Sequence, residues 1–354
     1  MAPTDRPIDE LHVPVLRDRI IDLLAPALSR PGAVHVDGTL GMAGHALAVL
    51  EAFPQARLVG IDRDPQALDV ARERLSAHAD RVDLVHATYD EVADVLDDLA
   101  IPEVDGALFD LGVSSLQLDD ADRGFSYART APLDMRMDQS QGRTAQEILD
   151  TADEREIARI LRVYGEERFA PRIARTIVRR REDGDPVATT QDLVDVVRAS
   201  VPAAARRTGG NPSKRTFQAL RIAVNAELEV LEAAVPRALN SVRVGGRLVV
   251  ESYQSLEDRI VKQAMVAGAT TNAPADLPFV PEDAAPYLEL VTHGAERADD
   301  EALPGDLTPL RSRRRADQAH QRDAADPAGH DRREGVGRHD RGDVDRDADE
   351  QHAQ

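Results

Sequence analysis

Residues 34–45 read VHVDGTLGMAGH, and this stretch decides the fold of the chain around it. It begins as a buried strand and runs directly into a glycine-rich turn. Gly38, Gly41 and Gly44 allow positive φ angles, so the backbone can approach a ligand that any Cβ would push away. A helix that begins near Gly44 points unpaired N–H groups at such a ligand. The pattern predicts a strand, turn and helix that bind a nucleotide-like molecule, although glycines alone are also typical of a tight structural turn.

A carboxylate follows the next predicted strand. Residues 57–61 form that strand, and it ends on Asp62, roughly at the offset where nucleotide-binding α/β folds place a carboxylate on the ribose. NAD, FAD and S-adenosylmethionine all present a ribose there. The glycine spacing departs from G-x-G-x-x-G, however, and Asp37 at the end of the first strand has no role in gripping a pyrophosphate. S-adenosylmethionine, a sulfonium cofactor without phosphates, therefore fits this turn better.

The composition narrows the class of protein. The 354 residues exceed the usual size of one domain, so we expect one large domain with an insertion or appendage. With no Cys, no Trp and 3% aromatic residues, aliphatic side chains must supply the core, and disulfide or thiolate-metal chemistry is excluded. The N-terminus lacks a basic segment followed by an apolar run, and no window approaches about 18 apolar residues. We therefore expect a cytoplasmic protein that is neither secreted nor embedded in a membrane.

The charge distribution is uneven. The formal net charge is -20, which argues against indiscriminate nucleic-acid binding because phosphate contacts rely on Lys and Arg. Two basic islands nevertheless interrupt the acidic chain, at Arg168–Arg181 and at Arg206–Arg221. Each island is either a solvated helix face or a surface that holds RNA. Under the second interpretation, Arg215 is a candidate substrate-binding residue.

Strand and helix patterns alternate up to Asp110, and the rhythm then stops. We predict strands at 33–37, 57–61, 82–86 and 105–110, and helices at 14–28, 44–52, 65–77 and 90–99. This alternation is typical of a parallel sheet covered by helices on both faces. From about residue 120 to 235 the pattern is helical, and it includes one long helix at 213–234 whose apolar side should pack on the sheet. Strand character returns at Arg247–Glu251.

The predicted fold class is therefore α/β, a Rossmann-like sheet with an inserted all-helical domain. We divide the chain into a first part of the sheet domain, the inserted substrate-binding domain, a second part of the sheet domain and a tail, at 1–118, 119–235, 236–300 and 301–354. The insert has a clear helix start, because Thr144 stands three residues before Glu147 as in a capping box. The tail is rich in Arg, Asp, Ala, His and Gln and cannot bury enough apolar surface to fold, so we expect it to be disordered.

A second carboxylate marks the end of the fourth strand. Asp110 leads into the polar loop LGVSSLQ at the edge of the sheet where ligands bind. In methyl transfer to an exocyclic amine, the nitrogen must be held in line with the sulfonium methyl group. A hydrogen-bond acceptor for its N–H bonds makes the nitrogen lone pair more available for attack. Asp110 is our candidate for this catalytic role or for holding the cofactor. The alternative is a loop carboxylate that caps a turn.

Another polar loop leaves the returning strand at the same edge. Tyr253 there is able to stack on a flipped base, while Gln254 and Ser255 supply hydrogen bonds, as base-modifying enzymes require. Ordinary packing of the Tyr253 ring is the alternative.

The aspartate-rich loops at 119–126 and 132–138 lack the spacing of a calcium loop, so we interpret them as hydrogen-bonding loops. The ten His residues show no zinc-ligand spacing, and we predict no metal site.

Taken together, these motifs resemble the bacterial 16S ribosomal RNA (cytosine-N4)-methyltransferase family. The resemblance spans roughly residues 10 to 300. It rests on HVPVL at 12–16, DGTLGMAGH at 37–45, IDRDP at 61–65, DLGVSS at 110–115, QLDD at 117–120, RGFS at 123–126, PLDMRMD at 132–138, YGEER at 164–168 and SLEDRIVK at 255–262. Several of these blocks are long enough to be highly specific.

The resemblance implies a class I S-adenosylmethionine-dependent methyltransferase with an inserted helical domain, acting on N4 of a cytidine in the decoding region of 16S rRNA in the small ribosomal subunit. It places the cofactor contacts on Ala43, Gly44 and His45 in the first loop, Asp62 at the ribose, Tyr89 beside the adenine, and Asp110 and Gln117 near the methyl group. Other amine substrates on RNA, DNA or protein remain alternatives, as does a noncatalytic assembly factor that binds S-adenosylmethionine. The sequence leaves the oligomeric state open, with a homodimer among the alternatives.

Three positions depart from the family pattern. Ala43 replaces a usual Gly, which fits if this residue offers mainly backbone and its φ is negative. Tyr253 and Gln254 stand where many members have Phe and His. No imidazole base is therefore available, and the proton of the amine must leave by another route, such as water. From about residue 300 the tail looks out of family, and we attribute it to a shifted reading frame. An intact mass of the native protein equal to that of the printed chain would refute this hypothesis.

Overall fold

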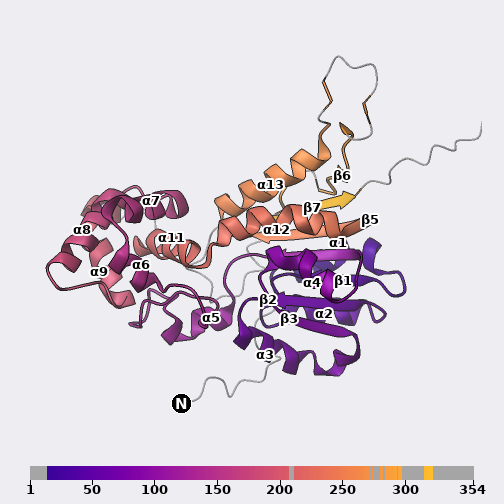
Figure 1. Ribbon diagram of the computed structural model, residues 1–354, viewed down its shortest axis with the longest axis horizontal. Coiled ribbons are helices and arrows are strands. Elements are labelled where there is room, and N and C mark those ends of the chain that lie inside the picture. The colour runs from indigo at the N-terminus through magenta and orange to yellow at the C-terminus, as the bar shows by residue number, and fades with distance from the viewer. Residues whose placement is uncertain are drawn as a thin grey trace, which may run out of the picture. The chain divides into compact units, whose positions relative to one another are not determined.

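The computed structural model describes residues 14–206, 211–271, 273–274, 280–281, 284–292, 294–296 and 315–321. These residues contain a seven-stranded sheet of order β3-β2-β1-β4-β5-β7-β6 (Figure 1). The strands are β1 (Val34–Asp37), β2 (Arg57–Asp62), β3 (Val82–His86), β4 (Val104–Asp110), β5 (Val242–Ser252), β6 (Leu288–Glu289) and β7 (Arg315–Gln321). The first five pair in parallel, and β7 runs antiparallel to both β5 and β6. The predicted α/β fold with a Rossmann-like parallel sheet is confirmed.

Helices cover both faces of the sheet. One face carries α1 (Arg17–Leu28), α2 (Gly44–Ala52) and α3 (Pro65–Arg74), and the other carries α4 (Val92–Asp98), α12 (Glu227–Ser241) and α13 (Ser255–Ala269). Neighbouring residues of a strand point to opposite faces, so Leu108 packs with α1 and α2 while Phe109 packs with α4 and α12. Both faces are buried, and this is why the strands are apolar runs rather than alternating ones.

Short segments link these elements. The 3-10 turns η2 (Ser76–Arg81), η3 (Tyr89–Glu91) and η4 (Ala121–Arg123) precede β3, α4 and the insert, and α5 (Ser115–Asp119) follows β4.

The insert has a core of its own. Its helices are α6 (Ala145–Thr151), α7 (Glu154–Gly165), α8 (Ala170–Glu182), α9 (Thr190–Ser200), α10 (Ala203–Arg206) and α11 (Ser213–Asn225). Apolar faces of α6, α7, α8, α9 and α11 pack on one another around Ile157, Ile173 and Leu220, all fully buried (Figure 1). The predicted capping box is confirmed, because the Thr144 hydroxyl accepts from Glu147 N at 3.1 Å and the Glu147 carboxylate accepts from Thr144 N at 2.9 Å.

The predicted helix at 213–234 is wrong, because the chain breaks there into α11 and α12. Ala226 lies between the two helices with a φ of 49°. The Asn225 side chain accepts from Met137 N and donates to Met135 O, both at 2.8 Å, and so anchors the break to the insert. Apolar residues of α11 join the core of the insert, whereas those of α12 from Leu231 onward join the core under the sheet. Helical periodicity continues through the break, so the pattern could not reveal it.

The tail also differs from its prediction over one segment. Residues 315–321 form β7, which pairs with β5 from Arg247 opposite His320 to Ser252 opposite Arg315. Backbone hydrogen bonds to an open sheet edge need no apolar side chains, so composition alone missed this strand. The rest of the predicted disordered tail, 301–314 and 322–354, lies outside the described residues. None of the described helices is long and apolar enough to cross a membrane.

Candidate active site

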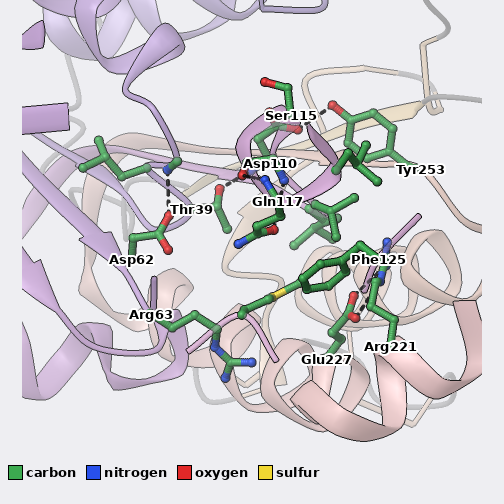
Figure 2. A pocket seen from close by; sticks show the side chains of 18 of the residues that line it. Thr39, Asp62, Arg63, Asp110, Ser115, Gln117, Phe125, Arg221, Glu227 and Tyr253 are labelled. Atoms are coloured by element: carbon green, nitrogen blue, oxygen red, sulfur yellow. Dashed lines mark hydrogen bonds and ion pairs between the residues drawn. The ribbon is translucent and has the colours of Figure 1, made fainter. Parts of the chain in front are cut away.

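A cavity of about 330 Å³ opens at the carboxyl edge of the sheet and extends to the insert (Figure 2). Most of the residues that the sequence predicted for the site line it, namely Gly44, His45, Asp62, Tyr89, Asp110, Gln117, Tyr253 and Gln254. Ala43, Arg215 and Ser255 do not. The structure thus gathers residues from the ends of β1, β2, β4 and β5, because the carboxyl ends of parallel strands meet at one edge.

The glycine-rich loop is shaped by packing as well as by the cavity. A Cβ at Gly38 would overlap the Phe109 ring, and Gly41 has a φ of 52°. Ala43 has a φ of 60°, so the condition of a negative φ at this position is not met. An alanine in this region is strained, typically by about 1 kcal/mol. Its methyl group is fully buried in the core cluster around Leu40 and Leu50, and this burial offsets the strain.

Asp62 closes the loop from the end of β2. Its Oδ2 accepts from Gly41 N at 2.7 Å, and its Oδ1 accepts from Asp64 N at 2.8 Å. Each carboxylate oxygen keeps a further acceptor site, which suits the ribose role predicted for this residue. Burial raises the pKa of Asp62 to about 6.

Other buried carboxyl groups share this acidic wall. Burial, with the charges of Asp110 and Asp62 adding to it, raises the pKa of Asp37 to about 8. On the insert side of the cavity, burial raises the pKa of Glu257 to about 7, against the opposing charge of Arg221. A cation bound beside these carboxyl groups would favour their ionised form.

The buried carboxyl groups predict a stability maximum on the acid side of neutrality. Asp37 in the folded protein holds a proton that the unfolded chain releases near its ordinary value of 3.8, so the free energy of unfolding falls as the pH rises from there to about 8. His35 acts in the opposite sense: burial lowers its pKa to about 4, so stability falls as the pH drops below 6.5. Thermal unfolding followed by circular dichroism should give a higher Tm near pH 6 than at pH 8.5.

Asp37→Asn tests the cause, because the amide has the same shape and does not ionise. We expect this variant to flatten the alkaline decline of Tm, whereas Asp98→Asn at the exposed end of α4 should leave the decline unchanged. An undiminished decline in Asp37→Asn would refute the assignment.

Asp110 lies at the centre of a polar group. Its backbone N–H donates to Thr39 Oγ1 at 2.6 Å, and its Oδ1 accepts from the Tyr253 hydroxyl at 2.7 Å (Figure 2). Its Oδ2 lies 3.6 Å from His45 Nε2, and the same nitrogen lies 3.9 Å from Glu251 Oε2.

Sequence reasoning missed Glu251, because residues 45, 110 and 251 meet only through the parallel pairing of the sheet. His45, Asp110 and Glu251 each offer a metal-ligand atom within 4.8 Å of the others, and the absence of a metal site stays a prediction.

Gln117 belongs to a buried network at the rim of the cavity. Its Oε1 accepts from Ser114 N at 3.2 Å, and its Nε2 donates to Asp64 Oδ2 at 3.0 Å. Arg123 binds the same carboxylate with both terminal nitrogens. The network joins α5 and η4 to the start of α3, and the cofactor contact implied for Gln117 stays a prediction.

The insert contributes an aromatic and charged wall that the sequence did not single out. Phe125, Tyr127 and Phe217 line the cavity, and the rings of Tyr127 and Phe217 meet edge to face at 5.8 Å. Arg221 donates twice to Glu227, both at 2.7 Å (Figure 2). Phe125 and Tyr127 lie in a loop, and Phe217 has only the periodicity of a core position in α11, so no local signal in the sequence indicated that the three rings converge on the cavity.

Arg215 lies apart from the other predicted site residues, and its role in substrate binding stays a prediction. It is exposed outside the cavity, where its Nη1 donates to Glu166 O at 3.3 Å, while Lys214 lines the cavity instead. Adjacent helical residues point about 100° apart, so a position within a basic island does not tell which cation faces the cavity.

Tyr89 lines the cavity with its ring 5.1 Å from the ring of Phe109.

Known proteins match most of this chain. The MraW methylase family matches residues 9–306. Ribosomal RNA small subunit methyltransferase H of Beutenbergia cavernae is 61% identical over 303 residues, which cover 86% of this chain and 91% of that protein. The proteins of the same name from Parafrankia sp. and Streptomyces avermitilis are 59% and 56% identical, over 83% and 88% of this chain and 89% and 98% of theirs. The family match ends close to the position where the tail departs from the expected pattern.

Proposed function

This chain belongs to the MraW methylase family, and from that premise we propose that it transfers a methyl group from S-adenosylmethionine to N4 of a cytidine in the decoding region of 16S rRNA. The observation that carries the proposal is the placement of Asp110 at the cavity between the glycine-rich loop and the aromatic wall of the insert. One side of the cavity suits a nucleoside cofactor, and the other suits a base.

The residues on the sheet side fit S-adenosylmethionine. When bound, this cofactor supplies a methyl group on a sulfonium, which is already a strong methyl donor. The acidic wall of Asp37, Asp62 and Asp110 favours a ligand with positive charge. Asp62 would accept from the ribose hydroxyls, Tyr89 would contact the adenine, and the loop around Gly44 would hold the amino-acid end.

Residues on the other side would hold the base and its amine. Phe125 and Phe217 offer apolar surface to a base withdrawn from its stack, as base-modifying enzymes require. Asp110 would accept an N–H bond of the amine, which orients the nitrogen lone pair toward the methyl group. In the transfer, the nitrogen lone pair would form the new N–C bond while the S–C electron pair would stay on the sulfur of the cofactor. The proton lost by the amine would pass through its hydrogen bond to Asp110 and on to water.

The exposed face of α8 suits the RNA backbone. Arg172, Arg175 and Arg179 are exposed at spacings of three and four residues, so they form one stripe, and the exposed Arg168 lies in the turn before the helix. Arg175 pairs with Glu154 at 3.3 Å, whereas Arg172 and Arg179 form no ion pair within the described part of the chain. Part of the second basic island, residues 207–210, lies outside the described residues.

Removing two charges from this stripe should weaken RNA binding in a salt-dependent way. For Arg172→Gln/Arg179→Gln, we expect the slope of log affinity against log salt concentration to become shallower by about two. Filter binding to small-subunit RNA between low and moderate salt measures the slope. A matched pair on the sheet domain, Arg17→Gln/Arg72→Gln, removes two exposed arginines and should leave the slope unchanged. Equal slopes for the stripe variant and the wild type would exclude α8 from the interface.

The proposed reaction is tested with tritiated S-adenosylmethionine and small ribosomal subunits from cells that lack this protein. Digestion to nucleosides should place the label in N4-methylcytidine, and mass spectrometry should show that this nucleoside is missing from the 16S rRNA of those cells. Label in another nucleoside, in DNA or in protein would show that the substrate is that molecule and not a cytidine of 16S rRNA. Cofactor binding without any transfer would favour the noncatalytic assembly factor.

A further inference from the structure

We infer that Tyr253 is a positioning residue for methyl transfer, whose phenol holds the Asp110 carboxylate in the orientation that accepts the N–H of the amine. The inference rests on the proposed function, and it gives Tyr253 a role other than the base stacking that the sequence suggested. The Tyr253 hydroxyl donates to Asp110 Oδ1 at 2.7 Å, and Figure 2 shows the ring directed at this carboxylate. Within the described part of the chain, this is the one hydrogen bond that the carboxylate accepts.

The other contacts of Asp110 do not fix its side chain. The bond from Asp110 N to Thr39 Oγ1 holds the backbone at the end of β4 and leaves the carboxyl group able to rotate. His45 Nε2 lies 3.6 Å from Oδ2, beyond the normal range of an N–H···O hydrogen bond. Asp110 is also partly exposed to the cavity, with 29% of its side chain accessible. A donor of fixed position is therefore needed to select one orientation.

Tyr253 is itself held firmly enough to be that donor. Its backbone N–H donates to Glu257 Oε2 at 2.9 Å, and Glu257 is buried in the first turn of α13. The Tyr253 ring lies against Gly112, where a Cβ would come 3.5 Å from ring carbon Cδ2, and Gly112 has a φ of 111° that favours glycine. The loops after β4 and β5 thus interlock, and the phenol is oriented before any ligand arrives.

This arrangement leaves the Asp110 carboxylate able to accept a hydrogen bond from the N–H of the amine. A hydroxyl bound to Oδ1 occupies one acceptor site of that oxygen, and the other sites of the carboxylate stay available to an N–H bond. Loss of the hydroxyl would leave the charge in place and remove its orientation. The misplacement of a reacting group by about 1 Å can cost up to about a hundredfold in rate.

Tyr253→Phe removes the hydroxyl and keeps the ring. We expect kcat to fall about tenfold, as for the loss of one hydrogen bond to a charged group, while KM for S-adenosylmethionine changes less than twofold. Tyr164→Phe is the matched control, because it removes a tyrosine–carboxylate bond of 2.6 Å to Glu229 that lies outside the cavity. Its kcat should stay within twofold of the wild type. A kcat of Tyr253→Phe within twofold of the wild type would overturn the inference.

A double-mutant cycle separates positioning from a structural role. If Tyr253 acts through Asp110, Tyr253→Phe should not lower the residual single-turnover rate of Asp110→Asn by more than twofold. A further tenfold loss in that background would overturn the inference.

A crystal structure of Tyr253→Phe with S-adenosylmethionine gives a readout that needs no activity. We expect Asp110 in more than one conformer, and a single unchanged conformer would overturn the inference. If the wild type methylates no small-subunit RNA, the proposed function fails, and this structure still decides the role of Tyr253.

Discussion

Asp110→Asn should lower the rate of methyl transfer about a hundredfold to a thousandfold, with little change in the affinity for S-adenosylmethionine. The amide has the shape of the carboxylate and still accepts from the Tyr253 hydroxyl at Oδ1. It places an NH₂ group where the carboxylate has Oδ2, so a donor then faces the donor N–H of the amine. The expected loss is that of a preorganised hydrogen-bond partner at a reacting group.

Single-turnover transfer to small ribosomal subunits measures this rate, and calorimetry measures the cofactor affinity. A rate within threefold of the wild type would remove Asp110 from the catalytic site. Weakened cofactor binding with an unchanged rate would reassign Asp110 to holding the cofactor, the alternative that the sequence left open.

Arg123→Met should cost about 3–5 kcal/mol of the free energy of unfolding, the loss typical of breaking a buried ion pair. Arg123 is 1% exposed and Asp64 is fully buried, and two hydrogen bonds of 2.6 and 2.9 Å join them. Methionine fills much of the space and leaves the carboxylate of Asp64 without its counter-ion. Gln117 then remains as a neutral donor to the same oxygen, and it cannot balance the charge.

Urea denaturation measures this loss. Arg159→Met is the matched control, because Arg159 also makes two hydrogen bonds to a carboxylate, Glu156, but on the exposed surface of α7. We expect less than about 1 kcal/mol there, as for exposed ion pairs. Adding Asp64→Asn to Arg123→Met removes the stranded charge and should recover part of the loss. Equal losses for Arg123→Met and Arg159→Met would show that burial does not matter to this pair.

The network around Asp64 also connects stability to the site. Asp64 caps α3 by accepting from Gln66 N, while Arg123 and Gln117 reach it from η4 and α5. These elements follow β2 and β4, the two strands that carry Asp62 and Asp110. Arg123→Met is therefore expected to loosen the rim of the cavity as well as the fold.

The sequence by itself determined the sheet and the edge that binds ligands. Apolar runs with glycine turns placed β1 to β4 within one residue of their observed ends, because strand and turn signals are local. Asp62 and Asp110 each follow such a run, and parallel pairing brings the ends of those runs together, so their convergence on one cavity was predictable.

Only the tertiary structure decided how the site is held and where the predicted long helix breaks. The bond from Tyr253 to Asp110 joins residues 143 positions apart, and the bond from Arg123 to Asp64 joins residues 59 apart. The positive φ of Ala226 interrupts a helical pattern that continues across it. Periodicity and spacing report on neighbours along the chain, whereas these features depend on which surfaces meet after the chain has folded.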